Sequence, residues 1–207
     1  MHASFASTQA KTALIVVDVQ NGFIDGGGLP VKGGAEVVPV INRLASVFEN
    51  IVITQDWHPP SHASFAINHA GRNPYDMATM PYGEQVLWPV HCVQGTWGAK
   101  FHADLQTDPA HLVIRKGFRA AIDSYSALFE NDRLTPTGLA GYLAERGVAK
   151  LTLVGLATDY CVAFSALDGA KGFSVTVLEG ACRAIDLGGS LAAQQAAMRA
   201  AGVTLLD

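Results

Sequence analysis

Three side chains that could form an activated nucleophile follow apolar runs of this sequence. Asp18 ends the run ALIVVD, Lys116 ends HLVIRK, and Cys161 follows LTLVGLATDY. Each run is typical of a buried parallel strand, and open α/β sheets bind ligands beyond the carboxyl ends of their strands. A carboxylate, an ammonium and a thiol that meet there could act as base, charge stabiliser and nucleophile in covalent catalysis. The sequence therefore predicts an enzyme.

Cys161 is predicted to begin a helix, within GLATDYCV. The partial positive charge of a helix N-terminus lowers the pKa of a thiol, and the nearby Lys116 would lower it further, so we expect an increased thiolate fraction. The alternative is a small buried apolar residue, the commonest state of a free cysteine, and Cys92 and Cys182 keep that interpretation. Taken singly, Asp18 could cap a turn and Lys116 could lie in solvent.

A second group of residues has the side chains of a metal site. Asp56 and His58 directly follow another apolar run, and His62 and His91 come later in the chain. One carboxylate with two or three imidazoles would suit Zn²⁺, Fe²⁺ or Mn²⁺. The Asp-x-His spacing is not diagnostic, and a histidine-rich loop that only forms hydrogen bonds is the alternative.

The apolar pattern predicts the elements that must position these side chains. Runs rich in Val, Ile and Leu predict strands over residues 13–18, 51–55, 111–115, 151–155, 174–178 and 203–206. Helical patterns lie between them, over 35–49, 137–147, 159–172 and 189–201. This alternation predicts an α/β fold: a three-layer αβα, Rossmann-like, doubly wound parallel sheet of about six strands.

Residues 56–110 interrupt the regular pattern with a segment dense in Pro, His, Gly and Trp. So long an irregular stretch is uncommon in a compact domain unless it is functional, and we expect the active site to take its walls from it. The chain is otherwise predicted as a single domain over 13–207, after a short, poorly ordered lead-in over 1–12.

Composition argues against several classes of protein. Hydrophobic residues make up 49% of the 207 residues and charged residues 15%, which is typical of a globular chain and unlike a disordered one. The net charge of -4, without a basic cluster, argues against nucleic acid and membrane partners. The N-terminus has no pattern of a secretory signal, and three irregularly spaced cysteines predict free thiols, so we expect a cytoplasmic protein.

Several segments together resemble the nicotinamidase/pyrazinamidase family of isochorismatase-like cysteine hydrolases, over essentially the whole chain. In the family's order they are VDVQNGF from residue 17, DWHPPSHASF from 56, WPVHCVQGT from 88, KG from 116, DSYSA from 123 and GLATDYCV from 155. The Asp, Lys and Cys positions mark the superfamily, and their combination with the metal-binding segment points to this family. Gly22, where an acidic residue is frequent, and the variable segment 119–122 depart from the pattern outside the triad.

The resemblance implies a catalytic triad and a metal site. The triad would consist of Asp18, Lys116 and Cys161. One divalent metal ion, with Zn²⁺ preferred over Fe²⁺ or Mn²⁺, would be bound by Asp56, His58 and His91. His62 matches a position that binds the metal in some members and only lines the site in others.

The resemblance also implies a substrate pocket. The ring of the substrate would be held by Phe23, Trp88, Tyr125 and Leu156. The peptide bond between Leu156 and Ala157 would be cis, and the backbone N–H groups of Ala157 and Cys161 would form the oxyanion hole.

The implied activity is hydrolysis of nicotinamide to nicotinate, and of pyrazinamide to pyrazinoate, through a cysteine thioester, in NAD recycling. The partner would be this small molecule, with no nucleic acid or membrane, and homo-oligomerisation stays open. Three alternatives remain: another cysteine hydrolase of the superfamily acting on a different small amide, a zinc hydrolase that uses metal-bound water, and a metal-binding or thiol-redox protein. The lack of a C-x-x-C arrangement at Cys161 argues against the redox alternative.

Overall fold

A parallel sheet of six strands forms the centre of the protein, whose computed structural model describes residues 11–207. The strand order is β5-β2-β1-β6-β7-β8, and every neighbouring pair is parallel. The strands are β1 (Lys11–Val17), β2 (Asn50–Asp56), β5 (Leu112–Lys116), β6 (Val148–Leu156), β7 (Ser174–Arg183) and β8 (Thr204–Leu206).

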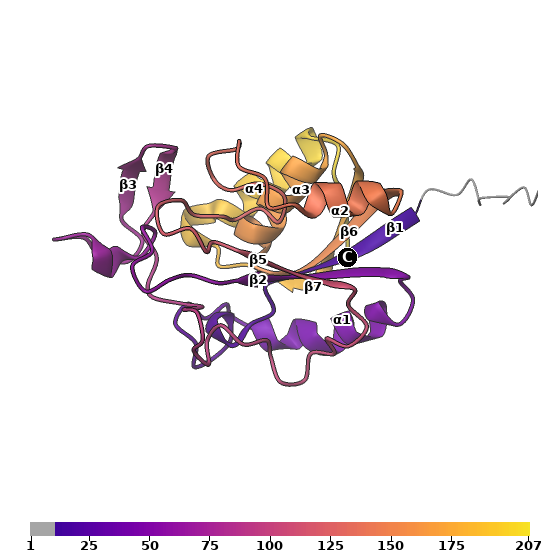
Figure 1. Cartoon of the computed structure of the whole chain (residues 1–207), viewed down its shortest axis with the longest axis horizontal. Coiled ribbons are helices and arrows are strands. Elements are labelled where there is room, and N and C mark those ends of the chain that lie inside the picture. The colour runs from indigo at the N-terminus through magenta and orange to yellow at the C-terminus, as the bar shows by residue number, and fades with distance from the viewer. Residues whose placement is uncertain (1–10) are drawn as a thin grey trace, which may run out of the picture.

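Helices cover both faces of this sheet (Figure 1). Helix α1 (Val37–Ala45) lies on one face, and the other face carries α2 (Leu139–Glu145), α3 (Ala163–Gly169) and α4 (Ser190–Ala200). Strand β1 separates the two cores, because its successive side chains point to opposite faces. Ile15 packs with the core under α2–α4, whereas Leu14 packs with the core under α1. The predicted three-layer αβα architecture is therefore confirmed.

The strand order changes direction between β1 and β6. From β1 the chain moves outward to β2 and β5, and it then crosses back to β6 and continues outward to β7 and β8. Neighbouring strands with crossovers leading in opposite directions leave a crevice beyond their carboxyl ends, which is where doubly wound sheets bind ligands. The residues after β1 and β6 therefore border this crevice.

The segment 56–110 contains a β-hairpin that the sequence did not predict. Strands β3 (Met77–Met80) and β4 (Gly83–Val86) pair antiparallel as a hairpin at one end of the molecule (Figure 1). Both strands are short and largely exposed, so they lack the apolar runs of the central sheet. The predicted lead-in lies outside the described residues except for its last two, which begin β1.

The predicted helices all exist with shorter bounds, and one has a different start. The predicted helix over 159–172 is a π-helical turn, Thr158–Val162, that continues into α3. Among residues 11–207, no helix has the length and apolar character needed to cross a lipid bilayer.

Candidate active site

Asp18, Lys116 and Cys161 meet beyond the carboxyl ends of three strands of the sheet. Asp18 directly follows β1, Lys116 is the last residue of β5, and Cys161 lies in the π-helical turn after β6. The Lys116 Nζ lies 2.8 Å from Asp18 Oδ2 and 3.3 Å from Cys161 Sγ. All three residues are buried. The structure thus brings these residues together as the sequence predicts.

The Asp18 carboxylate is held by Thr54 of β2. The Thr54 hydroxyl donates to Asp18 Oδ1 at 2.6 Å and accepts from the Asp18 backbone N–H at 3.1 Å. Asp18 has a φ of +47°, a left-handed conformation that is uncommon outside glycine and tends to occur at functional sites. Its Oδ2 pairs with the Lys116 ammonium.

The pKa of Asp18 is raised, and the pKa of Cys161 is raised well above the usual thiol value. Burial is the main cause for both groups; the Lys116 ammonium opposes it, and Asp56 adds to it. The expected acidic thiol was therefore wrong, because the sequence shows neither how deeply the sulfur is buried nor that a second carboxylate, Asp56, lies near it. A raised thiol pKa favours the protonated form of Cys161, which then needs a base, and Asp18 is the neighbouring group that can accept its proton.

Lys116 connects four groups around this site. Besides Asp18 and Cys161, its Nζ lies 2.7 Å from Asp56 Oδ1 and 2.9 Å from the Ser124 carbonyl oxygen. Burial alone would lower the pKa of Lys116, but the two carboxylates outweigh it and hold the pKa well above the usual value. The ammonium therefore stays charged and offsets the negative charge on both carboxylates.

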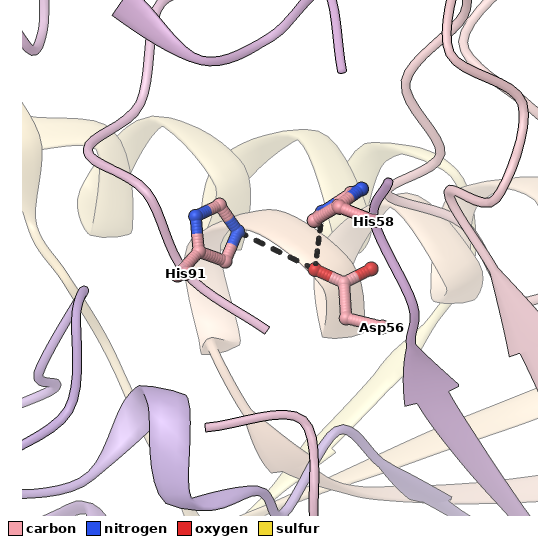
Figure 2. A group of neighbouring side chains, drawn as sticks. All are labelled: Asp56, His58 and His91. Carbon is pink, nitrogen blue, oxygen red and sulfur yellow. Dashed lines mark hydrogen bonds and ion pairs between the residues drawn. The ribbon is translucent and has the colours of Figure 1, made fainter. Parts of the chain in front are cut away.

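A possible metal-binding group, shown in Figure 2, lies next to the triad, because Asp56 Oδ1 contacts the Lys116 ammonium. Asp56 Oδ2 is 3.0 Å from His58 Nε2 and 3.5 Å from His91 Nε2. The Nδ1 atoms of the two histidines lie 2.9 Å and 2.8 Å from backbone carbonyl oxygens of Gly117 and Pro89. Because a carbonyl oxygen only accepts, we assign the proton to Nδ1 in each neutral ring, which leaves the Nε2 lone pairs directed at Asp56.

Three lone-pair donors that converge in a buried place favour a cation between them. The ligand atoms of Asp56, His58 and His91 all lie within 4.8 Å of one another. His58, when its ring is protonated, and the Lys116 ammonium outweigh burial and hold the pKa of Asp56 well below its usual value, and Asp56 in turn raises the pKa of His58. One carboxylate and two imidazoles with carbonyl-oriented rings are the donor set of a zinc or iron site with open positions, so the residues fit a divalent metal.

A pocket joins the nucleophile to this metal-binding group. It is lined by Phe23, Leu29, Asp56, Trp88, His91, Asp123, Tyr125, Ala157, Tyr160, Cys161 and Ile185. The ring centroids of Phe23 and His91 lie 5.3 Å apart. Trp88 packs edge-on against Tyr160, with 4.8 Å between their ring centroids. Aromatic walls between a thiol and a metal-binding group suit a flat aromatic ligand with two polar ends.

Comparisons with known proteins agree with this geometry. The isochorismatase domain model matches residues 12–207. A nicotinamidase from Acinetobacter baylyi is 56% identical over 192 residues, which cover 92% of this chain and 90% of that protein.

This chain belongs to the isochorismatase family.

Solved structures of the isochorismatase family resemble the chain over nearly its whole length. A nicotinamidase/pyrazinamidase from Acinetobacter baumannii is 53% identical, with a TM-score of 0.95, covering 97% of this chain and 98% of its own. A pyrazinamidase from Pyrococcus horikoshii, solved in complex with zinc, is 34% identical, with a TM-score of 0.76, covering 95% and 99%.

His62 of this protein lies beside the metal-binding group, and both of its ring nitrogens have hydrogen-bond partners. Its Nδ1 is 2.7 Å from the Ser64 hydroxyl, and its Nε2 is 3.2 Å from the Ile122 carbonyl oxygen. Burial is the main cause that lowers its pKa to about 4, and the charge of His58 lowers it further. Its ring centroid is 4.2 Å from that of His58. His62 therefore serves as a neutral neighbour of the Asp56, His58 and His91 group.

One of the four predicted substrate-binding residues does not line the pocket. Phe23, Trp88 and Tyr125 line it, but the Leu156 side chain is buried in the core under α1, because it points to that face of β6. The Leu156–Ala157 peptide bond is cis, as the resemblance implies. Leu29, Asp123, Tyr160 and Ile185 are lining residues that sequence reasoning missed. Tyr160 and Asp123 could have been found, because each lies within a family motif. Leu29 and Ile185 lie in loops that carry no such motif.

Proposed function

We propose that this protein is a nicotinamidase, an amidohydrolase that converts nicotinamide and water into nicotinate and ammonia and also accepts pyrazinamide. The observation that carries the proposal is the shared pocket, in which Cys161 and the metal-binding residues Asp56 and His91 face one aromatic-walled space. The similarity to nicotinamidases over more than nine tenths of the chain supports it.

The proposed first half of the reaction forms a thioester on Cys161. Asp18 Oδ2 takes the thiol proton as the sulfur attacks the amide carbon, and the C–N bond then breaks as Asp18 returns the proton to the departing ammonia. Lys116 stabilises the negative charge that Asp18 carries before it takes the proton, and its ammonium also lies beside the sulfur. The backbone N–H groups of Ala157 and Cys161 are proposed to stabilise the oxyanion, a contribution of about 3–4 kcal/mol for each donor.

The second half releases the product. Asp18 takes a proton from a water molecule as its oxygen attacks the thioester carbon, and the C–S bond then breaks as Asp18 returns that proton to the sulfur. The thiol is restored, and the nicotinic acid formed loses its proton to solvent to give nicotinate. Deprotonated Asp18 is needed at the start of each half, so Lys116 assists both by stabilising that form.

We propose zinc as the metal, held by Asp56, His58 and His91, because the donor set suits it and a related pyrazinamidase binds it. When bound, the metal supplies a Lewis acid that attracts the ring nitrogen and so orients the substrate. A cytoplasmic role in NAD recycling remains part of the proposal, as expected for a chain with free cysteines.

The deciding experiment measures ammonia release from nicotinamide by the metal-loaded protein and by its Cys161→Ala variant. We expect turnover by the first and a loss of at least about 10⁴-fold in the second, because the nucleophile is gone. Metal content, measured on both, should be unchanged. Cys182→Ala is the matched control, a buried free cysteine outside the pocket, and should keep its activity.

Two results would overturn the proposal in different ways. Substantial turnover by Cys161→Ala that disappears on chelation would indicate a metal-bound water as nucleophile. An active thiol with no turnover of nicotinamide or pyrazinamide would indicate a cysteine hydrolase of the same family that acts on another amide.

A further inference from the structure

Gln85 belongs to the β3–β4 hairpin, outside the proposed triad and metal group, but its side chain reaches the pocket wall. The residue is only 1% exposed although most of the hairpin lies at the surface. Its Nε2 lies 2.8 Å from Tyr125 Oη and 2.8 Å from Asp123 Oδ2. Both of these residues line the substrate pocket. One side chain of the hairpin therefore contacts two residues of the wall.

The oxygen of the Gln85 amide supports the same pocket wall through Asn131. Its Oε1 accepts from the Asn131 Nδ2 at 3.1 Å, and the Asn131 Oδ1 accepts from the Tyr125 backbone N–H at 3.0 Å. The Asn131 backbone N–H donates to the Asp123 carbonyl oxygen at 2.8 Å. Gln85 and Asn131 thus hold the main chain and the side chains of the segment 123–125 together.

Tyr125 depends on this contact for its place in the pocket. Its hydroxyl oxygen accepts from the Trp88 indole N–H at 2.9 Å as well as from Gln85. Burial raises the pKa of Tyr125 well above its usual value, so the hydroxyl stays neutral. Without Gln85 the hydroxyl and the Asp123 carboxylate each lose a donor in a buried place, and both side chains would have to move or admit water.

We propose that Gln85 is a positioning residue that sets the width of the aromatic pocket from the β3–β4 hairpin and thereby controls substrate affinity. The proposal rests on the nicotinamidase function proposed above. None of the hydrogen bonds of Gln85 goes to Asp18, Lys116 or Cys161. Its loss is therefore expected to weaken binding of the ring more than the chemical step.

The test compares Gln85→Leu and Gln85→Glu with the wild-type protein in steady-state kinetics with nicotinamide. Leucine removes every hydrogen bond, whereas glutamate keeps the shape and loses the N–H donors. We expect both to raise KM by about tenfold or more, with kcat lowered by less than about threefold and the metal content unchanged. The dissociation constant of nicotinate, followed by tryptophan fluorescence, should rise in parallel with KM.

Thr79→Ala is the matched control for the hairpin, because it removes the bond from the Thr79 hydroxyl to Glu84 at the exposed side and leaves the pocket untouched. It should keep the KM of the wild type. If Gln85→Leu does not fold, Gln85→Asn, which retains the amide but shortens its reach, takes its place with the same expected rise in KM.

The outcomes separate the two proposals. A wild-type protein that releases no ammonia from nicotinamide refutes the nicotinamidase function itself. An active wild type whose Gln85 variants keep KM and nicotinate affinity within twofold overturns only the positioning role. The same holds if the melting temperature falls and kcat drops while KM stays constant, since that would mean that Gln85 serves only to fold the hairpin.

Discussion

Lys116 Nζ lies 2.7 Å from Asp56 Oδ1, and the other oxygen of the same carboxylate faces His58 and His91. The Asp56 carboxylate therefore links the proposed triad to the proposed metal site. Two buried carboxylates, Asp18 and Asp56, share one ammonium, which makes their joint negative charge tolerable in the interior. The proposed roles of the two sites would couple nucleophile activation to substrate orientation through the Asp56 carboxylate.

Lys116→Met should destabilise the protein as well as inactivate it. Removing the ammonium leaves two buried carboxylates without their shared partner, and losing one member of a buried ion pair costs about 3–5 kcal/mol. Urea unfolding at neutral pH measures this loss. Lys171→Met is the control, because Lys171 is largely exposed and its ion pair with Asp168 should contribute about 1 kcal/mol or less. Adding Asp18→Asn to Lys116→Met should recover part of the stability; no recovery would contradict the charge-sharing argument.

Thr54→Val should impair catalysis while leaving the metal in place. The Thr54 hydroxyl is the donor to Asp18 Oδ1, and a hydrogen bond to a charged group contributes about 1.5–3 kcal/mol, so kcat/KM is expected to fall by about 10- to 100-fold. Valine has nearly the same shape as threonine, which limits changes in packing. Thr152→Val, in β6 of the same sheet, is the matched control and should retain activity. If kcat/KM falls equally in both variants, the loss comes from a disturbed sheet and not from the contact with Asp18.

The parts of the fold set by continuous apolar runs could be predicted from the sequence. Strand β1, whose residues are buried on both faces of the sheet, is such a run, and its position next to β6 follows from the doubly wound pattern. The approach of Asp18 to Cys161 could be predicted for the same reason, because both follow strands at the point where the order changes direction.

Properties that depend on tertiary neighbours could not be predicted. The raised pKa of Cys161 comes mainly from burial, and Asp56 at the end of β2 adds to the effect of the expected neighbour Asp18; no local pattern reports on the burial or on Asp56. Leu156 carries the family pattern, but the face to which its side chain points is fixed only once β6 is packed. Gln85 lies in a hairpin without apolar alternation, so its burial becomes visible only when the hairpin is placed against the segment 123–131.

Gly117→Ala should weaken metal binding. Gly117 has a φ of +65°, and a Cβ there would lie 2.4 Å from His58 Cε1, so alanine would displace the ring whose Nδ1–H the Gly117 carbonyl accepts. Losing such a supporting contact lowers metal affinity by about 10- to 100-fold. Competition with a chromophoric chelator measures the affinity for zinc. Gly141→Ala in α2, where a Cβ meets nothing within 4 Å, is the control and should bind zinc like the wild type.

His62 should make the stability of the metal-free protein depend on pH. Its pKa is lowered to about 4 in the folded state from 6.5, mainly by burial, so the unfolded chain binds the extra proton first as the pH falls. The stability that neutral His62 contributes is complete above pH 6.5 and is lost as the pH falls toward 4, by about 3 kcal/mol in all.

His62→Gln should therefore flatten the decline of the unfolding free energy between pH 7 and pH 4. Urea titrations in the presence of a chelator measure it, since bound metal would add its own proton linkage. An equal slope in His62→Gln would mean that other groups carry the acid sensitivity.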